Sequence, residues 1–367
     1  MVDGLEFFSD DYSHARTGFL SLAERRAATV TSYPISPRGP AGEELAIDVA
    51  WIGSREPRRA LVVSSGIHGV EGFYGSAVQR QLLTSQLDVL ALPCDVALVL
   101  VHAINPYGFA HLRRVNESNV DLNRNFVDHP GGHVRAPEYT ALYDLLNPTD
   151  MDPEAEQARI ARLFAIAEEQ GFERLQQVVT GGQYEHPAGI QFGGQRQETS
   201  NANVRSLCRA HLGGLSELVW LDLHTGLGAP ATLQAIMACP HDAPEMDRAR
   251  AIWGDRAVSM RVPGQSASAD LRGALAYGVA EELAHRVEVS LALAEVGTHD
   301  PVRVFLALRA DNWLHHHGEV DSEPGRAIKA ELKEAFCPAD AGWRRTSLAV
   351  GAEVIAQAAA HFAAHDD

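Results

Sequence analysis

The stretch ALVVSSGIHGVEG, residues 60–72, decides the fold class. It begins with a short apolar run that ends in a Ser-Gly pair, and a polar motif follows. Three further apolar runs are of the same kind, at residues 96–101, 218–223 and 289–294. Near-continuous apolar strands with helices between them indicate a sheet that is covered on both faces. The sequence therefore predicts an α/β fold with a mixed, mostly parallel central sheet and helices on both faces.

Patterns on either side of these runs predict the remaining elements. Residues 13–28 predict a leading helix, and two strands are expected at residues 28–33 and 44–52, the second from its alternating apolar side chains. A helix is expected at residues 75–83, and helical patterns from residue 309 onward predict further packing helices. We therefore expect helices both between the strands and after the last one.

Residues 128–216 interrupt this alternation as a longer insertion. Within it, residues 150–177 predict a charged, amphipathic helix, and the Gly- and Gln-rich residues 181–194 predict a structured loop. No repeat of fixed period and no Gly/Ser- or Pro-rich linker divides the sequence. We therefore expect one domain over residues 1–367 that carries this insertion.

The composition is that of an ordinary folded protein. The 367 residues are 46% hydrophobic and 22% charged, which provides for a sizeable core and excludes disordered and low-complexity classes. The formal net charge is −17, from 31 basic and 48 acidic residues. That sign is wrong for binding a nucleic-acid backbone or an anionic membrane surface. We therefore expect neither as a partner, and the sequence does not indicate the oligomeric state.

The cysteines and the start of the chain favour a cytoplasmic protein. Cys94, Cys208, Cys239 and Cys337 lie far apart and without C-x-x-C spacing, which excludes a thiolate zinc site and argues against a disulfide framework. The first twelve residues include acids and no basic segment, so no signal peptide is expected. The apolar runs are far shorter than the roughly 20 residues that span a bilayer.

Each of the four apolar runs is followed by a polar residue: His68, Asn105, His224 and Glu295. Ligands of open α/β sheets bind at the carboxyl ends of the strands. The placement of these side chains therefore indicates a functional site at that edge of the sheet.

His68 is followed three residues later by Glu71, and both side chains have the chemistry of metal ligands. His68 and Glu71 have the H-x-x-E spacing, which places an imidazole and a carboxylate close enough to share one ion. The same spacing occurs at His285/Glu288 and His316/Glu319, where charged helical surroundings indicate neighbours on a solvated face. A catalytic zinc needs three protein ligands. His224 is the best third candidate, although a single strand-end histidine is more often a hydrogen-bonded core residue.

The segment Val120-Asp121-Leu122-Asn123-Arg124-Asn125-Phe126 resembles the signature of the zinc carboxypeptidase family. Asn105-Pro106-Tyr107-Gly108 is similar to that family's Asn-Pro-Asp-Gly turn, with Tyr107 in place of the acid. The H-x-x-E motif lies upstream and a strand-end histidine downstream, which is the family's order. The resemblance is closest to an uncharacterised bacterial branch related to succinylglutamate desuccinylase and aspartoacylase. It implies the zinc carboxypeptidase-like α/β/α sandwich.

The resemblance also implies a metal site. His68, Glu71 and His224 would bind one zinc ion per chain. Asp121 would accept the other ring N–H of His68 and so fix its tautomer.

Three further residues of the resemblance would contact the substrate. Asn123 and Arg124 would hold a substrate carboxylate, Arg124 through its planar fork of donors. Arg114 would stabilise the developing oxyanion together with zinc. Arg113 would suit this role if the register slips by one residue, but the spacing favours Arg114.

The general base that the resemblance implies is Glu295. A carboxylate at the end of an apolar strand is costly unless it is used or paired. Zinc lowers the pKa of a bound water toward ~7, and Glu295 would take the proton and return it to the leaving amine.

Other residues near these motifs have less specific patterns. Tyr277 is the only tyrosine between His224 and Glu295, and would cover the bound substrate as a tyrosine does in peptide-cleaving relatives; a helix-packing aromatic is an equal alternative. Gln183 and Tyr184 could line the pocket on composition alone. His299 is interpreted as a neighbour of the site and not as a ligand.

Signatures of other enzyme classes are missing from the sequence. It has no G-x-S-x-G elbow, P-loop or H-E-x-x-H motif. The glycines at 226 and 228 lack the later glycine of the dinucleotide fingerprint. Nucleophilic and nucleotide-dependent classes therefore have no support.

The sequence as a whole predicts a zinc hydrolase that cleaves an amide bond next to a free carboxylate. The substrate is either a short peptide cut at its C-terminus, which is slightly favoured, or an N-acyl amino acid, as in relatives that remove succinyl or acetyl groups. A third hypothesis, of another class, is a non-catalytic binding module that keeps the fold and the metal without turnover.

Overall fold

The computed structural model describes residues 4–364 of the chain. Eight strands form a single sheet in the order β1-β2-β4-β3-β5-β8-β6-β7. They span Thr29–Arg38, Glu44–Ile52, Val96–His102, Arg59–Ser65, Glu217–Pro230, Glu288–Gly297, Leu233–Met237 and Ala257–Ser259, in that same order. β4, β3, β5 and β8 are parallel to one another, whereas β1, β2 and β6 run antiparallel to their inner neighbours. The predicted mixed, mostly parallel sheet is confirmed.

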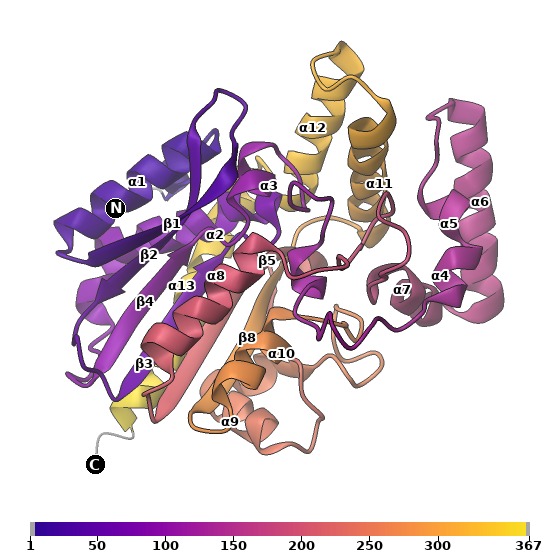
Figure 1. Cartoon of the computed structure of the whole chain (residues 1–367). Helices are drawn as coiled ribbons and strands as arrows, with labels where there is room; N and C mark the ends of the chain where they lie inside the picture. The colour runs from indigo at the N-terminus through magenta and orange to yellow at the C-terminus, as the bar shows by residue number, and fades with distance from the viewer. Residues whose placement is uncertain (1–3, 365–367) are drawn as a thin grey trace.

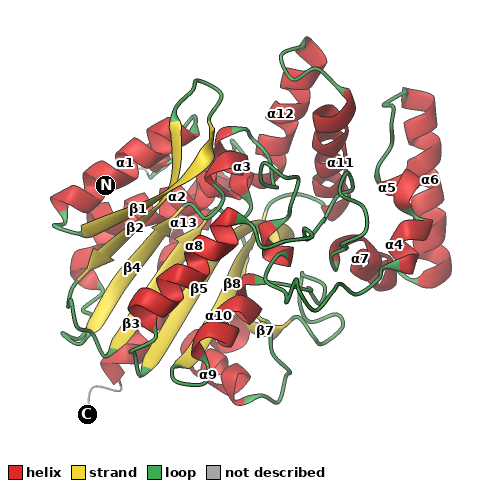
Figure 2. Ribbon diagram, viewed as in Figure 1, coloured by secondary structure: helices red, strands yellow, loops and turns green. Residues whose placement is uncertain are grey.

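Helices cover both faces of this sheet (Figure 2). α1 (Tyr12–Arg25), α2 (Gly72–Gln81), α9 (Pro244–Trp253) and α13 (Ala341–Ala364) pack together on one face. α8 (Thr199–Leu207) and α10 (Leu275–Leu283) lie on the other. The central strands are therefore buried on both sides, and every residue of β3 and β4 is buried. This explains why their sequences read as continuous apolar runs.

The helix α13 is long and apolar enough to cross a membrane, and no other helix within residues 4–364 is. In this structure it packs against α2, α9 and the sheet. Its side chains Leu348, Val354, Ile355 and Phe362 are fully or almost fully buried in the larger core cluster. Its apolar composition is therefore accounted for by packing inside the fold.

A group of helices lies beyond the carboxyl ends of the strands (Figure 1). α11 (Pro301–His317) and α12 (Glu323–Phe336) follow β8, and the short helix α3 (Pro106–Ala110) follows β4. The insertion supplies α4 (Pro137–Ala141), α5 (Tyr143–Leu146), α6 (Pro153–Gln170) and α7 (Phe172–Thr180). These helices surround the edge of the sheet at which the sequence predicts a site.

Several predicted boundaries differ from the structure. The helix expected at 150–177 is two helices, because Gly171 has a φ of 94° and breaks the helical path between α6 and α7. Packing helices begin at Pro301 and not at 309, since Asp300 accepts a hydrogen bond from the Val302 amide and caps the helix. β6 and β7 were missed, because strands of five and three residues are too short to show a period.

Candidate functional site

The H-x-x-E motif lies in the sharp turn after β3. Gly66 has a φ of +63°, and a Cβ there would lie 2.8 Å from that of Ala103, so the turn requires glycine. A Cβ on Gly69 would lie 2.0 Å from the backbone of Gly108, which shows how closely this loop packs against α3. The turn places His68 Nδ1 2.9 Å from Glu71 Oε1.

His224 lies beside this motif. It belongs to β5, which is the parallel neighbour of β3, and its Nδ1 is 3.1 Å from Glu71 Oε2. One ligand atom from each of His68, Glu71 and His224 lies within 4.8 Å of the other two, and all three side chains are buried. Two imidazoles and one carboxylate at this spacing form the donor set of a catalytic zinc site with an open position.

The second ring nitrogen of each histidine supports the same interpretation. His68 Nε2 is 3.1 Å from Asp121 Oδ1, as the signature implies, and His224 Nε2 is 2.7 Å from Asp222 Oδ2. Each imidazole therefore has one nitrogen facing the cluster and the other facing a carboxylate. A carboxylate in this position orients the ring of a metal-binding histidine. The residues present therefore fit a zinc ion.

Asp222 is a residue of the site that the sequence analysis missed. It lies two residues before His224 on β5, so both side chains are on the same face of the strand. Its other oxygen accepts a 2.6 Å hydrogen bond from Ser64, and Ser64 accepts one from the indole of Trp220. An acid inside the otherwise apolar run 218–223 was the available signal, because a buried carboxylate needs partners.

The electrostatics of the cluster favour a positive charge at its centre. Burial by itself would raise the pKa of Glu71, but the imidazoles of His68 and His224 lower it far below its usual range. Burial would likewise lower the pKa of His224, but Asp222 and Glu71 raise it well above its usual value. The carboxylates of Asp222 and Glu71 therefore favour positive charge at His224, and a bound cation would also supply positive charge there.

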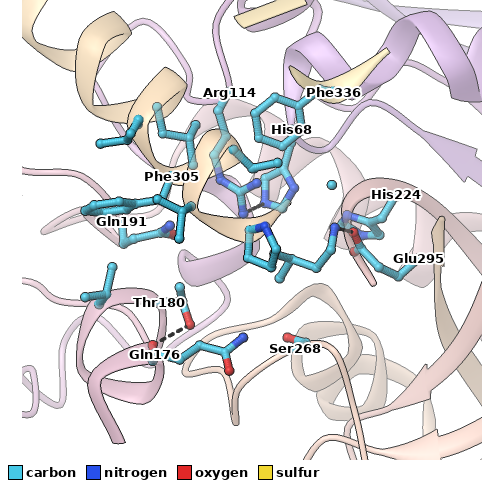
Figure 3. A pocket seen from close by; sticks show the side chains of 18 of the residues that line it. His68, Arg114, Gln176, Thr180, Gln191, His224, Ser268, Glu295, Phe305 and Phe336 are labelled. Carbon is cyan, nitrogen blue, oxygen red and sulfur yellow. Dashed lines mark hydrogen bonds between the residues drawn. The ribbon is translucent and has the colours of Figure 1, made fainter. Parts of the chain in front are cut away.

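Glu295 lies beside His224, on the same side of the cavity (Figure 3). It is the register partner of His224 on the neighbouring strand β8, and its Oε1 accepts a 2.9 Å hydrogen bond from the Leu227 amide. It is 8% exposed. Burial, together with the negative charge of Glu71, raises the pKa of Glu295 to about 7. A carboxyl group with that pKa can both accept and return a proton near neutral pH.

Arg114, and not Arg113, lies in the cavity. Arg114 donates to Glu71 (3.0 Å) and to Asp121 (3.1 Å), and its Nη2 lies 2.8 Å from His68 Nε2. Arg113 is buried away from the cavity, where it donates to Asp311 and Asn119. The side chain of Asn105 holds the Arg114 carbonyl at 3.1 Å, so the turn after β4 helps to present this arginine.

Asn123 and Arg124 also line the cavity. The guanidinium of Arg124 donates to the carbonyl of Thr180 through Nε (3.1 Å) and Nη2 (2.7 Å), which ties it to the end of α7. Asn123 accepts from the Leu275 amide at 2.8 Å. Its buried Nδ2 has no hydrogen-bond partner within residues 4–364.

The other candidate residues lie outside this cavity. Tyr277 lines a separate hollow beside α9 and α10, where its hydroxyl is 3.3 Å from Arg261. Tyr184 is buried and donates to the Arg124 carbonyl at 2.6 Å, and Gln183 accepts from the amides of its own loop. His299 contacts Glu334 and Arg303. The structure thus does not bring Tyr277 to the groups that would carry the chemistry.

The sequence places the pocket lining in the insertion and in residues 260–290, but it does not identify the individual residues of the remaining wall. Phe305 and Gln191 lie on the side opposite His224 and Glu295, and Gln176, Thr180 and Ser268 lie on a third side (Figure 3). These residues come from α7, α11 and loops that are far apart in the sequence. No motif connects them, so only the folded chain identifies them.

Comparisons with known proteins agree with this fold. A family model described as "Protein of unknown function (DUF2817)" matches residues 8–350. A search of curated proteins found no match. The solved structure of bovine thrombin-activatable fibrinolysis inhibitor in complex with tick carboxypeptidase inhibitor is similar, with a TM-score of 0.52, 10% identity and coverage of 98% of each chain.

Two bacterial structures were also found. One is a metallo-carboxypeptidase from Burkholderia cenocepacia, with a TM-score of 0.46, 14% identity, and coverage of 95% of this chain and 69% of that one. The other is a succinylglutamate desuccinylase/aspartoacylase family protein from Shewanella amazonensis, with a TM-score of 0.35, 20% identity, and coverage of 79% and 73%. At 10% identity, the match to the bovine structure shows the fold alone. The carboxypeptidase-like α/β/α fold implied by the signature is confirmed.

Proposed function

The chain belongs to the DUF2817 family, described as proteins of unknown function, and from that premise we propose an activity from its site. We propose a zinc-dependent hydrolase that cleaves an amide bond next to a free carboxylate. The domain would span the chain, with residues 128–216 as its insertion. The proposal is supported most by one observation: His68, Glu71, His224, Arg114 and Glu295 all line one cavity.

His68, Glu71 and His224 would hold the zinc ion. When bound, the ion would act as a Lewis acid that lowers the pKa of an attacking water. Asp121 and Asp222 would keep the two imidazoles in the orientation that presents Nδ1.

Glu295 would move the proton. Its carboxylate lies on the strand next to His224 and lines the same cavity, so it can take a proton from water and give it to the leaving amine. The Leu227 amide holds one oxygen of this carboxylate, which leaves the other free to face the substrate.

Arg114 and the Asn123-Arg124 pair would contact the substrate. Arg114 is the cation nearest to the metal ligands and would stabilise negative charge on the carbonyl oxygen. The unpartnered Nδ2 of Asn123 would donate to the substrate carboxylate. Arg124 would add charge, in exchange for part of its contact with Thr180.

The first test is the metal content of purified protein by elemental analysis. We expect about one zinc per chain in the wild type and little in His68→Ala. His285→Ala is a matched control, because His285 belongs to an exposed H-x-x-E pair and its loss should leave the zinc in place. Absence of metal from all three proteins after growth with zinc would refute the metal site.

A substrate screen follows on the loaded protein. Hippuryl-type dipeptides test the peptidase, and acetyl- and succinyl-amino acids test the deacylase. Binding of these compounds without hydrolysis would instead support the non-catalytic module.

A further inference from the structure

One side of the cavity is built by helices and not by the sheet. α6, α7 and α11 contribute a set of apolar side chains that we call the apolar wall: Ile160, Leu163, Phe164, Phe172, Leu175 and Phe305. Behind this wall, Leu163 and Val179 belong to a small hydrophobic cluster with Tyr139, Leu146 and Ile190. The wall is therefore held by packing of its own, separate from the two clusters that flank the sheet.

Two residues of the apolar wall expose large aromatic surfaces. Phe164 is 50% exposed and Phe172 is 52% exposed, although both line the same cavity as the metal ligands. Burial of apolar area stabilises a complex by about 25 cal/mol per Å². A ligand that covers these rings while its amide lies at Glu295 would therefore gain affinity from them.

None of the charged residues of the cavity belongs to the apolar wall. Among the described residues that line it they are His68, Glu71, Arg114, Arg124, His224 and Glu295. Arg114 is already paired with Glu71 and Asp121, and Arg124 with the Thr180 carbonyl. Beyond one carboxylate on the Asn123-Arg124 pair, the cavity thus has no cation left for a second one. Burying an unpaired charge is costly.

Three neutral polar residues of the cavity, Gln176, Thr180 and Thr225, also make hydrogen bonds within the chain. The hydroxyls of Thr180 and Thr225 donate to the backbone carbonyls of Gln176 and Phe336. The side-chain amide of Gln176 donates to the backbone carbonyl of Ala267. The wall therefore matches an apolar group better than a hydroxylated or charged one.

We infer that the substrate carries a single carboxylate and one large apolar group, which lies on the apolar wall. This rests on the proposed function and narrows it: dianionic amides such as succinyl-amino acids or acyl-aspartates are poor substrates. The apolar group is either the acyl chain of an N-acyl amino acid or the side chain of a C-terminal residue. Both have the same chemistry, and the test separates them.

The test uses two substrate series on zinc-loaded protein. One varies the acyl chain on glycine from acetyl to decanoyl, and the other varies the amino acid in N-acetyl-glycine, -leucine and -phenylalanine. We expect kcat/KM to rise about fourfold per added methylene in one series, from the transfer free energy of a methylene group. A rise in the first series places the apolar group on the acyl side, and a rise in the second places it on the amino-acid side. Flat dependence in both, with measurable turnover, would overturn the inference and leave the proposed function intact.

Binding gives a readout that does not need turnover. Calorimetric titration with acetate, hexanoate, decanoate, acetyl-glycine and acetyl-phenylalanine should show tighter binding of the larger apolar ligands. If none of the amides is hydrolysed but this trend is present, the proposed function fails and the assignment of the apolar wall stands. Equal or undetectable binding throughout would overturn the assignment.

Variants test whether the dependence on the size of the apolar group arises at the apolar wall. Phe164→Ser and Phe172→Ser should reduce the dependence of kcat/KM on the size of the apolar group by severalfold. Val89→Ser should not, because Val89 is an exposed apolar residue of η4 (Leu87–Val89) that does not line the cavity. Because both phenylalanines are half exposed, their loss should not unfold the protein. A second copy of the chain is another possible occupant of the apolar wall, and sedimentation of wild type and Phe164→Ser tests it. If the wild type self-associates, Phe164→Ser does not, and binding is independent of ligand size, the inference is contradicted.

Discussion

The two ends of the cavity are built in different ways. At the charged end, every ligand is buried and lies on or directly after a strand of the sheet, and each histidine has a carboxylate behind it. At the apolar wall, the side chains come from helices outside the sheet, and two phenylalanines are half exposed. Hydrogen bonds therefore fix the geometry of the charged end, whereas only packing positions the side chains of the apolar wall.

The difference follows from the forces at work. Buried charges are stable only with partners at hydrogen-bond distance, so the charged end needs a chain of contacts such as His224–Asp222–Ser64–Trp220. Apolar burial has no direction, so the wall can change its residues and still bind. The reaction would therefore depend on residues of the sheet. The choice of substrate would depend on the insertion and α11.

The largest expected effect is at the charged end. Glu295→Gln keeps the size of the side chain but removes the base, so kcat should fall by about 10² to 10⁴ with zinc retained. Glu288→Gln is the matched control, since Glu288 is exposed at the other end of β8 and should leave kcat unchanged. Steady-state kinetics with elemental analysis checks both, and a near-wild-type kcat in Glu295→Gln would show that another group is the base.

Asp222 tests whether the contacts behind the histidines matter. Asp222→Asn keeps the shape of the side chain but loses the charge that orients His224, and zinc affinity should fall by about 10- to 100-fold. Competition with a chelator measures this. Phe172→Ser, on the apolar wall, should bind zinc like the wild type. Equal zinc affinity in Asp222→Asn would mean that strand geometry alone fixes the ligand.

Arg124 connects the two ends, because it lines the cavity and holds the last residue of α7. Arg124→Ala should raise KM by about tenfold or more, from the loss of a charge-assisted hydrogen bond, and lower kcat less. The exposed Arg272, which does not line this cavity, provides the control Arg272→Ala. A loss of kcat at unchanged KM would contradict the carboxylate-binding role.

The smallest effect is a dependence of stability on pH in metal-free protein. Burial raises the pKa of Glu295 to about 7, so the folded state holds its proton more tightly than the unfolded state. The resulting stability is present at acidic pH and is lost as pH rises through 7, by about 1 kcal/mol between pH 6 and pH 8. Denaturant unfolding with a chelator should show this loss reduced in Glu295→Gln. A wild-type curve that gains stability over this range relative to the variant would reverse the sign.

Added zinc should weaken the effect. A cation between Glu71 and His224 would offset the negative charge that helps to raise the pKa of Glu295. The difference between wild type and Glu295→Gln across pH 6 to 8 should therefore shrink in loaded protein. The apolar wall contains no titratable group and should not contribute.

The sequence by itself determined the sheet and the order of its polar strand ends. Short unbroken apolar runs that end at turn signals are typical of strands buried on both faces, and the carboxyl ends of parallel strands meet at one edge. For that reason His68, His224 and Glu295 could be expected together before any contact was known. The fold class and its resemblance to the zinc carboxypeptidases followed from the same runs and from the 120–126 signature.

The tertiary structure alone decided what surrounds those residues. Asp222 contacts His224 because both side chains lie on the same face of β5. The loop after α3 directs Arg114 into the cavity and Arg113 away from it. The position of α10 places Tyr277 outside the cavity. The apolar wall joins residues more than 100 positions apart in sequence. Motifs record local spacing, whereas packing between distant helices depends on the whole chain.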